Sequence, residues 1–286
     1  MTDLFHHREG TTVSRIIRQS KPAEYRIWLK CITGTYPVQT YLKRIGIAKS
    51  PICPHCSEAV PESLTHFACV CPKFREARTS AHNQVRAVIT SFLSETVGAE
   101  WKMYEETPLA KTGLVLRPTA LASIDQLGRR QPYWILVSDV LKRIAIPDLC
   151  RPSDVVPSQL LMAAKRKQHA YGPLKEALSY YTDQGWIIHI FPWVVGIRGM
   201  IDPKHVESLL KFLGVQHKYW QVAVERSVLA SVRALHFLHT VRFGGRSEAT
   251  LTAFNPEIVV VSQTIVWKMQ CLRGKCATTM SGPLSV

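Results

Sequence analysis

Residues that bind metal ions are concentrated in one short segment of this sequence. Cys53 and Cys56 are separated by two residues, and His66, Cys69 and Cys71 follow within the next fifteen positions. Two cysteines at this spacing present both thiolates from one tight turn, which suits the tetrahedral coordination of Zn²⁺. Two further ligands would fill the shell and leave no open position for a substrate. The sequence therefore predicts a structural zinc site rather than a catalytic one.

The identity of the remaining ligands depends on the conformation around His66. His55 lies inside the turn between the first two cysteines, where its ring is expected to point away from a metal ion. If residues 63–70 form a helix, Cys69 shares the face of His66, because positions three or four apart lie together on a helix. A helix that ends at residue 70 would instead turn Cys71 inward. These residues alone leave both cysteines as candidates.

The chain is strongly basic. It has 36 Lys and Arg against 21 Asp and Glu, which gives a formal net charge of +15. Such a charge favours a polyanionic partner, and we expect nucleic acid. The alternative is a protein whose basic surface serves only solubility. Six basic residues flank the cysteine-rich segment and are the candidate nucleic-acid contacts: Lys43, Arg44, Lys49, Lys73, Arg75 and Arg78.

Composition and hydropathy indicate a folded intracellular protein. Apolar residues make up 46% of the chain and charged residues 20%, values that are typical of globular proteins. Residues 1–20 contain no apolar stretch of signal-peptide length. The longest apolar run, 186–197, is interrupted by His189 and Pro192 and is too short to span a bilayer. We therefore expect neither secretion nor a membrane role.

The first part of the sequence has the periodicity of helices. Apolar residues recur at helical spacing over 11–45, interrupted by Pro22 and by the turn signal at 34–37. A further helix is predicted over 72–93. Residues 94–130 show no sustained period and contain several Gly and Pro, so we interpret them as a linker between two halves.

The second half alternates strand-like and helical segments. Short apolar runs at 134–137 and 143–146, on either side of a polar turn, predict a β-hairpin. A helical pattern covers 158–182, with Gly172-Pro173 as a candidate break. A strand and two helices then follow, at 186–191, 205–213 and 218–242. Strands that alternate with helices predict an α/β fold, in which helices cover a sheet.

Four short motifs follow one another before residue 73: the run from Thr35 to Gly46 (TYPVQTYLKRIG), Cys53-Pro54-His55-Cys56, Thr65-His66-Phe67 and Cys71-Pro72. In this order they resemble the segment that follows the reverse transcriptase in many non-LTR, LINE-type retrotransposon proteins. The resemblance implies that Cys53, Cys56, His66 and Cys71 form a CCHC zinc knuckle that holds element RNA or target DNA near the polymerase. It also implies that the chain is a C-terminal fragment of a longer polyprotein that acts in the nucleus.

A second set of residues lies on the elements of the other half. Pro132-Tyr133 precedes the first strand-like run, Asp148 follows the second, and Lys165 and Lys167 lie on the predicted helix. This arrangement resembles the restriction-like endonuclease domain of site-specific non-LTR elements, whose signature is Pro-Asp, a second acid and a helical Lys. The resemblance implies that Asp148, Lys165 and Lys167 are catalytic and that paired carboxylates hold Mg²⁺.

Tyr133 stands where the signature has its first acid. A phenol is neutral near pH 7 and is a poor ligand for Mg²⁺, so we expect cleavage to be impaired. Asp139 lies in the hairpin turn, far from Asp148, and Asp154 is equally explained as a cap of the helix that follows. Asp148 and Lys167 also have simpler interpretations, as a polar strand end and a solvated helix face.

The expected organisation has five parts: a helical lead-in (1–50), the CCHC knuckle and following helix (51–93), a linker (94–130), a restriction-endonuclease-like domain with a C-terminal helix (131–244) and a poorly ordered tail (245–286). The expected fold class is α/β, with a helical zinc-knuckle region before a mixed sheet flanked by helices. The expected function is nucleic-acid binding, with an endonuclease domain that nicks target DNA for target-primed reverse transcription. The alternatives are a non-enzymatic interaction module and a degenerate element copy without function.

Overall fold

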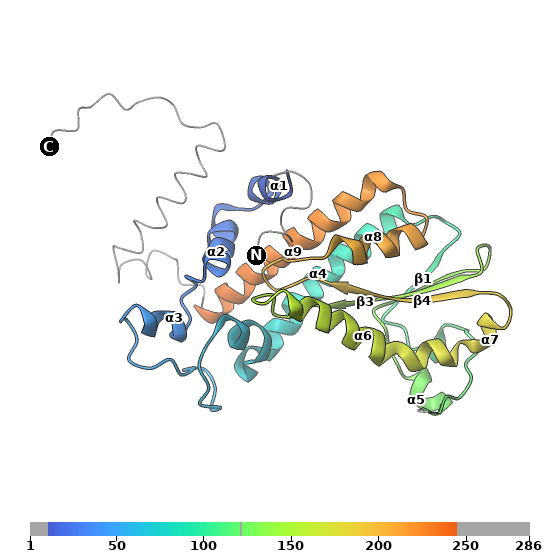
Figure 1. Ribbon diagram of the computed structural model, residues 1–286, viewed down its shortest axis with the longest axis horizontal. Coiled ribbons are helices and arrows are strands. Elements are labelled where there is room, and N and C mark those ends of the chain that lie inside the picture. Colours follow the sequence, from blue (N-terminus) through green and yellow to red (C-terminus); the bar gives the residue numbers. More distant parts are fainter. Residues whose placement is uncertain (1–10, 121, 245–286) are drawn as a thin grey trace, which may run out of the picture. The chain divides into compact units, whose positions relative to one another are not determined.

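The computed structural model describes residues 11–120 and 122–244, and Figure 1 shows its elements. Within the described part, the residues up to Val241 belong to one compact unit, and the few from Arg242 onward do not belong to it. None of the helices in the described part combines the length and the apolar character that crossing a membrane requires.

Helices dominate the chain before the first strand. The helices predicted within 11–45 are confirmed as α1 (Thr11–Gln19), α2 (Pro22–Thr33) and α3 (Gln39–Arg44). The cysteine-rich segment then leads through two short turns into one long helix. These elements are the π-helical turn η1 (His66–Val70), the 3-10 turn η2 (Pro72–Phe74) and α4 (Arg75–Thr96).

Local sequence signals explain the bounds of α2. Pro22 occupies the first turn, where its missing N–H needs no partner. Gly34 follows the last turn with a φ of 71°, a left-handed conformation that glycine adopts without strain. Ile27, Trp28 and Cys31 lie on the buried face, so tertiary packing adds to these signals.

The helix predicted over 72–93 is present as η2 and α4, which continues to Thr96. Ala81, Val85 and Ile89 recur every fourth residue and are buried, as expected for the core-facing stripe of an amphipathic helix. The opposite face of α4 is polar and exposed.

Four strands form one mixed sheet in the order β1 (Lys102–Glu105), β2 (Trp134–Ser138), β3 (Arg143–Cys150) and β4 (Ile187–Val194). β1 and β3 both pair antiparallel with β2, whereas β3 and β4 are parallel. Parallel neighbours need a crossover connection, and α6 (Ser158–Ala177) provides it. The predicted α/β class and the β2–β3 hairpin are therefore confirmed.

Helix α6 covers one face of the sheet (Figure 1). Ile144 and Ile146 alternate along β3 with residues of the other face, and they pack with Leu174 of α6 and Ile188 of β4. All four are almost fully buried. The apolar strand runs of the sequence thus build the core on this side.

The other face is covered by α4 and by two later helices, α8 (Pro203–Phe212) and α9 (Trp220–Arg242). Trp134 of β2 donates from its indole N–H to Thr90 Oγ1 of α4 at 2.9 Å. Trp193 of β4 donates in the same way to Ser227 Oγ of α9 at 3.2 Å. These buried indoles satisfy their polar atoms while their rings fill the core. Four short elements complete the described chain: η3 (Leu109–Lys111), α5 (Ile124–Gly128), α7 (Ser179–Thr182) and η4 (His217–Tyr219).

Residues 94–130, interpreted as a linker, contain structure and core residues. β1 forms an edge of the sheet, and Leu109 and Leu127 have no exposed surface. The sequence gives little sign of this, because β1 is only four residues long and carries a charge at each end, as edge strands often do. The two predicted halves therefore belong to one compact unit.

Helix α6 also differs from the prediction, since it continues through Gly172-Pro173. Proline removes one helical hydrogen bond. Leu174 and Ala177 are fully buried beyond it, and their packing offsets that loss. The tail predicted at 245–286 lies outside the described residues.

Candidate metal centre and strand-end site

Cys53, Cys56, His66 and Cys71 come together in one cluster. One ligand atom of each lies within 4.8 Å of all the others. The Sγ atoms of Cys53 and Cys71 are 3.9 Å apart, and Cys56 Sγ is 3.5 Å from His66 Nε2. A tetrahedral Zn²⁺ with bonds of about 2.0–2.3 Å would place its ligands about 3.5–3.8 Å apart. The cluster can therefore hold a metal ion such as zinc.

The backbone around the first two cysteines forms a small hairpin-like loop. Cys53 N donates to Val60 O at 2.9 Å, and Ile52 forms an antiparallel bridge with Pro61. Ala59 has a φ of 50°, a left-handed conformation that closes the loop. This closure presents both thiolates of the C-x2-C turn on one side.

The π-helical turn determines which later cysteine joins the cluster. Cys71 N donates to His66 O at 2.7 Å, five residues back, and the helix then ends. A π-helical turn brings residues five apart onto one side, so Cys71 rather than Cys69 faces His66. Cys69 lies apart from the four, and burial raises the pKa of its thiol to about 11. Spacing alone did not distinguish these two geometries.

His55 and Glu62 support the loop from outside the cluster. The His55 Nε2 atom is 3.7 Å from Glu62 Oε1, and the imidazole packs edge-on against Phe74. Glu62 is fully buried, and its other carboxylate oxygen accepts from Gln39 N at 2.9 Å. The carboxylate therefore ties the first turn of α3 to the metal-binding loop.

Burial also affects the thiols of the cluster. The pKa of Cys53 is raised by burial, and that of Cys71 is raised to about 11 for the same reason. A divalent cation would supply the positive charge that stabilises buried thiolates. Three thiols and an imidazole are therefore the donors expected for a metal ion that prefers thiolate and imidazole ligands, such as Zn²⁺.

A second group of residues meets where β2 begins and β3 ends. The pairing of β2 with β3, continued by three residues, puts Tyr133 opposite Asp148, and Tyr133 N lies 3.4 Å from Asp148 Oδ1. Lys167 of α6 forms an ion pair with the other carboxylate oxygen. Tyr171, one turn further along α6, contributes to the electrostatic environment of Asp148, and the centre of its ring lies 5.8 Å from the Lys167 ammonium. The structure therefore brings together Tyr133, Asp148 and Lys167, which the sequence singled out, and adds Tyr171.

Asp148 carries the negative charge of this strand-end site. Its side chain is only 1% exposed. Burial raises the pKa of this carboxyl, whereas Lys167 acts to lower it. Lys165 is exposed on α6, and the ion pair is made by Lys167.

The strand-end site does not fit a magnesium ion held by paired carboxylates. Across residues 11–120 and 122–244, the Cys₃His cluster is the one group of three or more His, Cys, Asp or Glu side chains placed to hold a metal. Asp148 is already neutralised by Lys167, and Tyr133 contributes a phenol whose pKa burial raises further. The site therefore offers one lysine-paired carboxylate where the endonuclease signature has two acids.

The other two acids that the sequence offered lie elsewhere. Asp139 is exposed in the β2–β3 turn, as predicted. Asp154 is not a helix cap but is fully buried, and its Oδ1 is 3.0 Å from Nε of Arg198. It also accepts from the backbone N–H of Met200 at 3.0 Å. Trp28 donates to Arg198 O at 2.7 Å, so the loop after β4 that holds this ion pair is also bonded to α2.

Five of the six candidate nucleic-acid contacts are exposed at the surface. Arg44 is exposed, although one nitrogen of its guanidinium donates to Gly34 O at 3.2 Å. Arg78 is half-buried and donates to the carbonyl of Cys71. The remaining four are exposed: Lys43, Lys49, Lys73 and Arg75.

A scan of the sequence against protein-family models gives no match, and a search of curated proteins finds no significant match.

Proposed function

We propose that the chain is a nucleic-acid-binding module with a structural Zn²⁺, derived from the C-terminal part of a non-LTR retrotransposon protein. The observation that carries this proposal is the Cys₃His cluster with tetrahedral spacing, flanked by exposed lysines and arginines. A zinc ion would fix the loop, while the cations neutralise phosphates of element RNA or target DNA. Target DNA is chromosomal, so the proposal includes action in the nucleus.

The second part of the proposal concerns the strand-end site. We interpret it as a restriction-like endonuclease site that lacks its first acid. Support comes from Tyr133, directly before β2, which lies opposite Asp148 of β3, and from Lys167, which pairs with Asp148. An intact site of this kind would nick target DNA, and the new 3′ end would prime reverse transcription. Here the single, lysine-paired carboxylate favours a binding role with impaired cleavage.

Nucleic-acid binding is tested by its dependence on salt. Affinity for a single strand and for a duplex should fall steeply as salt rises, because phosphate contacts release counterions. A triple variant, Lys43→Gln, Lys49→Gln and Lys73→Gln, should weaken binding and flatten this dependence. A control variant removes the same charge from three exposed lysines elsewhere, Lys111, Lys211 and Lys218, and should bind like wild type. Affinity that is independent of salt would contradict the proposal.

The interpretation of the strand-end site is tested with supercoiled plasmid and magnesium. Wild type should convert little of it to open circle. Tyr133→Asp places a second carboxylate opposite Asp148 and should increase nicking. The increase will be partial if the groups that orient the metal ligands have also changed. Addition of Asp148→Asn to this variant should remove the gain. If Tyr133→Asp nicks no better than the double variant, the non-enzymatic module becomes the better interpretation.

A further inference from the structure

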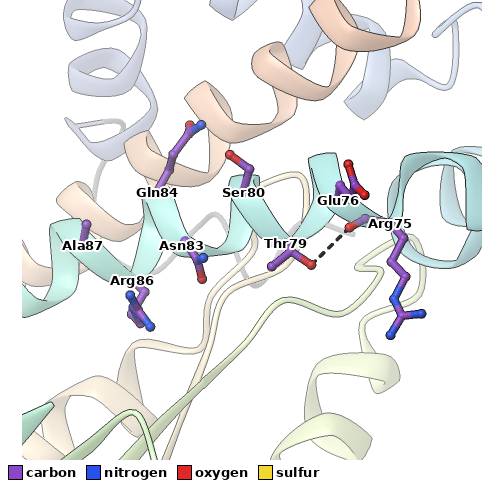
Figure 2. A pocket seen from close by; sticks show the side chains of 8 residues that line it. All are labelled: Arg75, Glu76, Thr79, Ser80, Asn83, Gln84, Arg86 and Ala87. Carbon is purple, nitrogen blue, oxygen red and sulfur yellow. Dashed lines mark hydrogen bonds between the residues drawn. The ribbon is translucent and has the colours of Figure 1, made fainter. Parts of the chain in front are cut away.

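One side of helix α4 carries a row of polar side chains. Figure 2 shows Arg75, Thr79, Asn83 and Arg86 directed to the same side of the helix. The first three of these residues also line a neighbouring cavity of about 280 Å³. The cavity lies between α4, the π-helical turn and the residues that follow β3. It is separate from the Cys₃His cluster, and none of the cluster ligands lines it.

The cavity is positively charged. Three guanidinium groups line it, those of Arg75, Arg78 and Arg151, and no acidic side chain is among the described residues around it. Two buried carboxylates, Asp148 and Asp154, already have cationic partners of their own. Uncompensated cations in a recess attract an anion more strongly than the same cations on an open surface.

Two polar atoms in the cavity walls lack partners in the described part of the chain. Arg151 donates from Nη2 to Ser231 Oγ at 3.2 Å, but its Nε is buried and makes no hydrogen bond. His82 Nε2 is also buried without a partner, and burial beside Arg151 lowers the pKa of this imidazole to about 4. A buried guanidinium N–H normally has an acceptor, so the wall of this cavity keeps hydrogen-bonding capacity that the described residues leave unused.

We propose that this cavity, lined by Arg75, Arg78 and Arg151, binds a terminal phosphomonoester, which belongs to a free nucleotide or to the end of a nucleic-acid strand. The strand-end source rests on the proposed nucleic-acid function, whereas the nucleotide source does not. A phosphomonoester offers three acceptor oxygens and close to two negative charges near pH 7. These match three guanidinium groups that bind oxyanions through paired N–H donors.

An internal phosphodiester fits this cavity less well. It carries one negative charge, and its chain must leave in two directions, which a recess does not allow.

The Arg78 guanidinium is held in position by the metal-binding segment, because it donates to the carbonyl of Cys71. The metal-binding segment therefore positions one wall of the phosphate cavity.

The test compares the ends of otherwise identical single strands by fluorescence anisotropy with the full chain. One strand has a 5′-phosphate, one a 3′-phosphate and one hydroxyls at both ends. Charge-assisted hydrogen bonds of this kind should make a phosphorylated strand bind at least about tenfold more tightly than the hydroxyl strand. Calorimetry with adenosine 5′-monophosphate and with adenosine then tests the nucleotide source, and only the monophosphate should bind.

Variants locate the effect. Arg75→Gln and Arg151→Gln should each abolish the preference for phosphate, whereas Arg129→Gln removes the same charge from an exposed position on a different element and should keep it. Circular dichroism checks the fold of each variant. If Arg151→Gln does not fold, the result for Arg75→Gln decides whether the arginines bind the phosphate, because Arg75 is exposed and its replacement should not disturb the core.

The outcomes separate this cavity from the proposed function. Equal binding of all three strands, together with no binding of the monophosphate, overturns the phosphate cavity and leaves nucleic-acid binding intact. Binding of the monophosphate without binding of any strand supports the cavity and contradicts the proposed function. A preference for phosphate that survives both Arg75→Gln and Arg151→Gln also overturns the assignment.

Discussion

Replacement of Cys71 by Ser should weaken metal binding and destabilise the whole unit. Structural zinc sites contribute about 10–16 kcal/mol in small zinc domains, so one of four ligands accounts for about 3 kcal/mol. A change of 1 kcal/mol shifts the melting temperature by about 2–4 °C in a chain of this size, which predicts a fall of about 6–12 °C. Cys71 is fully buried and its Sγ lies 3.9 Å from that of Cys53, so no solvent ligand reaches the vacated position easily.

Cys69→Ser is the matched control. Both changes replace a sulfur by an oxygen two positions apart, but only Cys71 belongs to the cluster. Elemental analysis should find one zinc per chain in wild type and in Cys69→Ser, and less in Cys71→Ser, while thermal denaturation reports stability. The assignment fails if Cys71→Ser keeps its zinc and Cys69→Ser loses it.

Four further predictions concern the rest of the unit. Lys167→Met should lower the free energy of unfolding by about 3 kcal/mol in chemical denaturation, because it leaves Asp148 buried and unpaired, whereas Asp148→Asn should change it by less than about 1 kcal/mol. Since burial raises the Asp148 pKa above its ordinary value of 3.8, wild type should lose stability relative to Asp148→Asn as pH rises through the folded-state pKa. Arg198→Met should cost about 3 kcal/mol or more by the same measurement, because Asp154 is fully buried. A fragment of residues 131–244 should be unfolded by circular dichroism and rapidly digested by protease.

The ligands of the metal cluster were largely predictable from the sequence. The C-x2-C turn is a local geometry, so Cys53 and Cys56 can be recognised as ligands from their spacing. His66 follows at a sequence separation that is common in zinc sites. The fourth ligand was not predictable from the residues alone. It depends on a π-helical turn, and the hydrogen bond from Cys71 to His66 that defines this turn has no signature in the sequence.

Long-range ion pairs and weak strands were beyond prediction for a different reason. Asp154 and Arg198 are separated by 44 residues, and their contact exists only because the loop after β4 folds back toward the segment after β3. Gly196 permits this approach, since a Cβ there would lie 2.2 Å from Asp154 Oδ2. No periodic pattern of one segment carries that information. The facing positions of Tyr133 and Asp148 were easier to predict, because the turn of a hairpin fixes the register of its two strands.

The fragment prediction follows from the way α4 and β1 join the two predicted halves. Removal of residues up to 130 would take away β1 and leave β2, whose residues are all buried, as an exposed edge. It would also remove Thr90, the acceptor for the Trp134 indole N–H, and Leu109 and Leu127 from the core. These losses exceed the marginal stability of a small domain. A fragment that instead keeps residues 11–244 should fold, and cooperative folding of 131–244 alone would show that the sheet needs neither α4 nor β1.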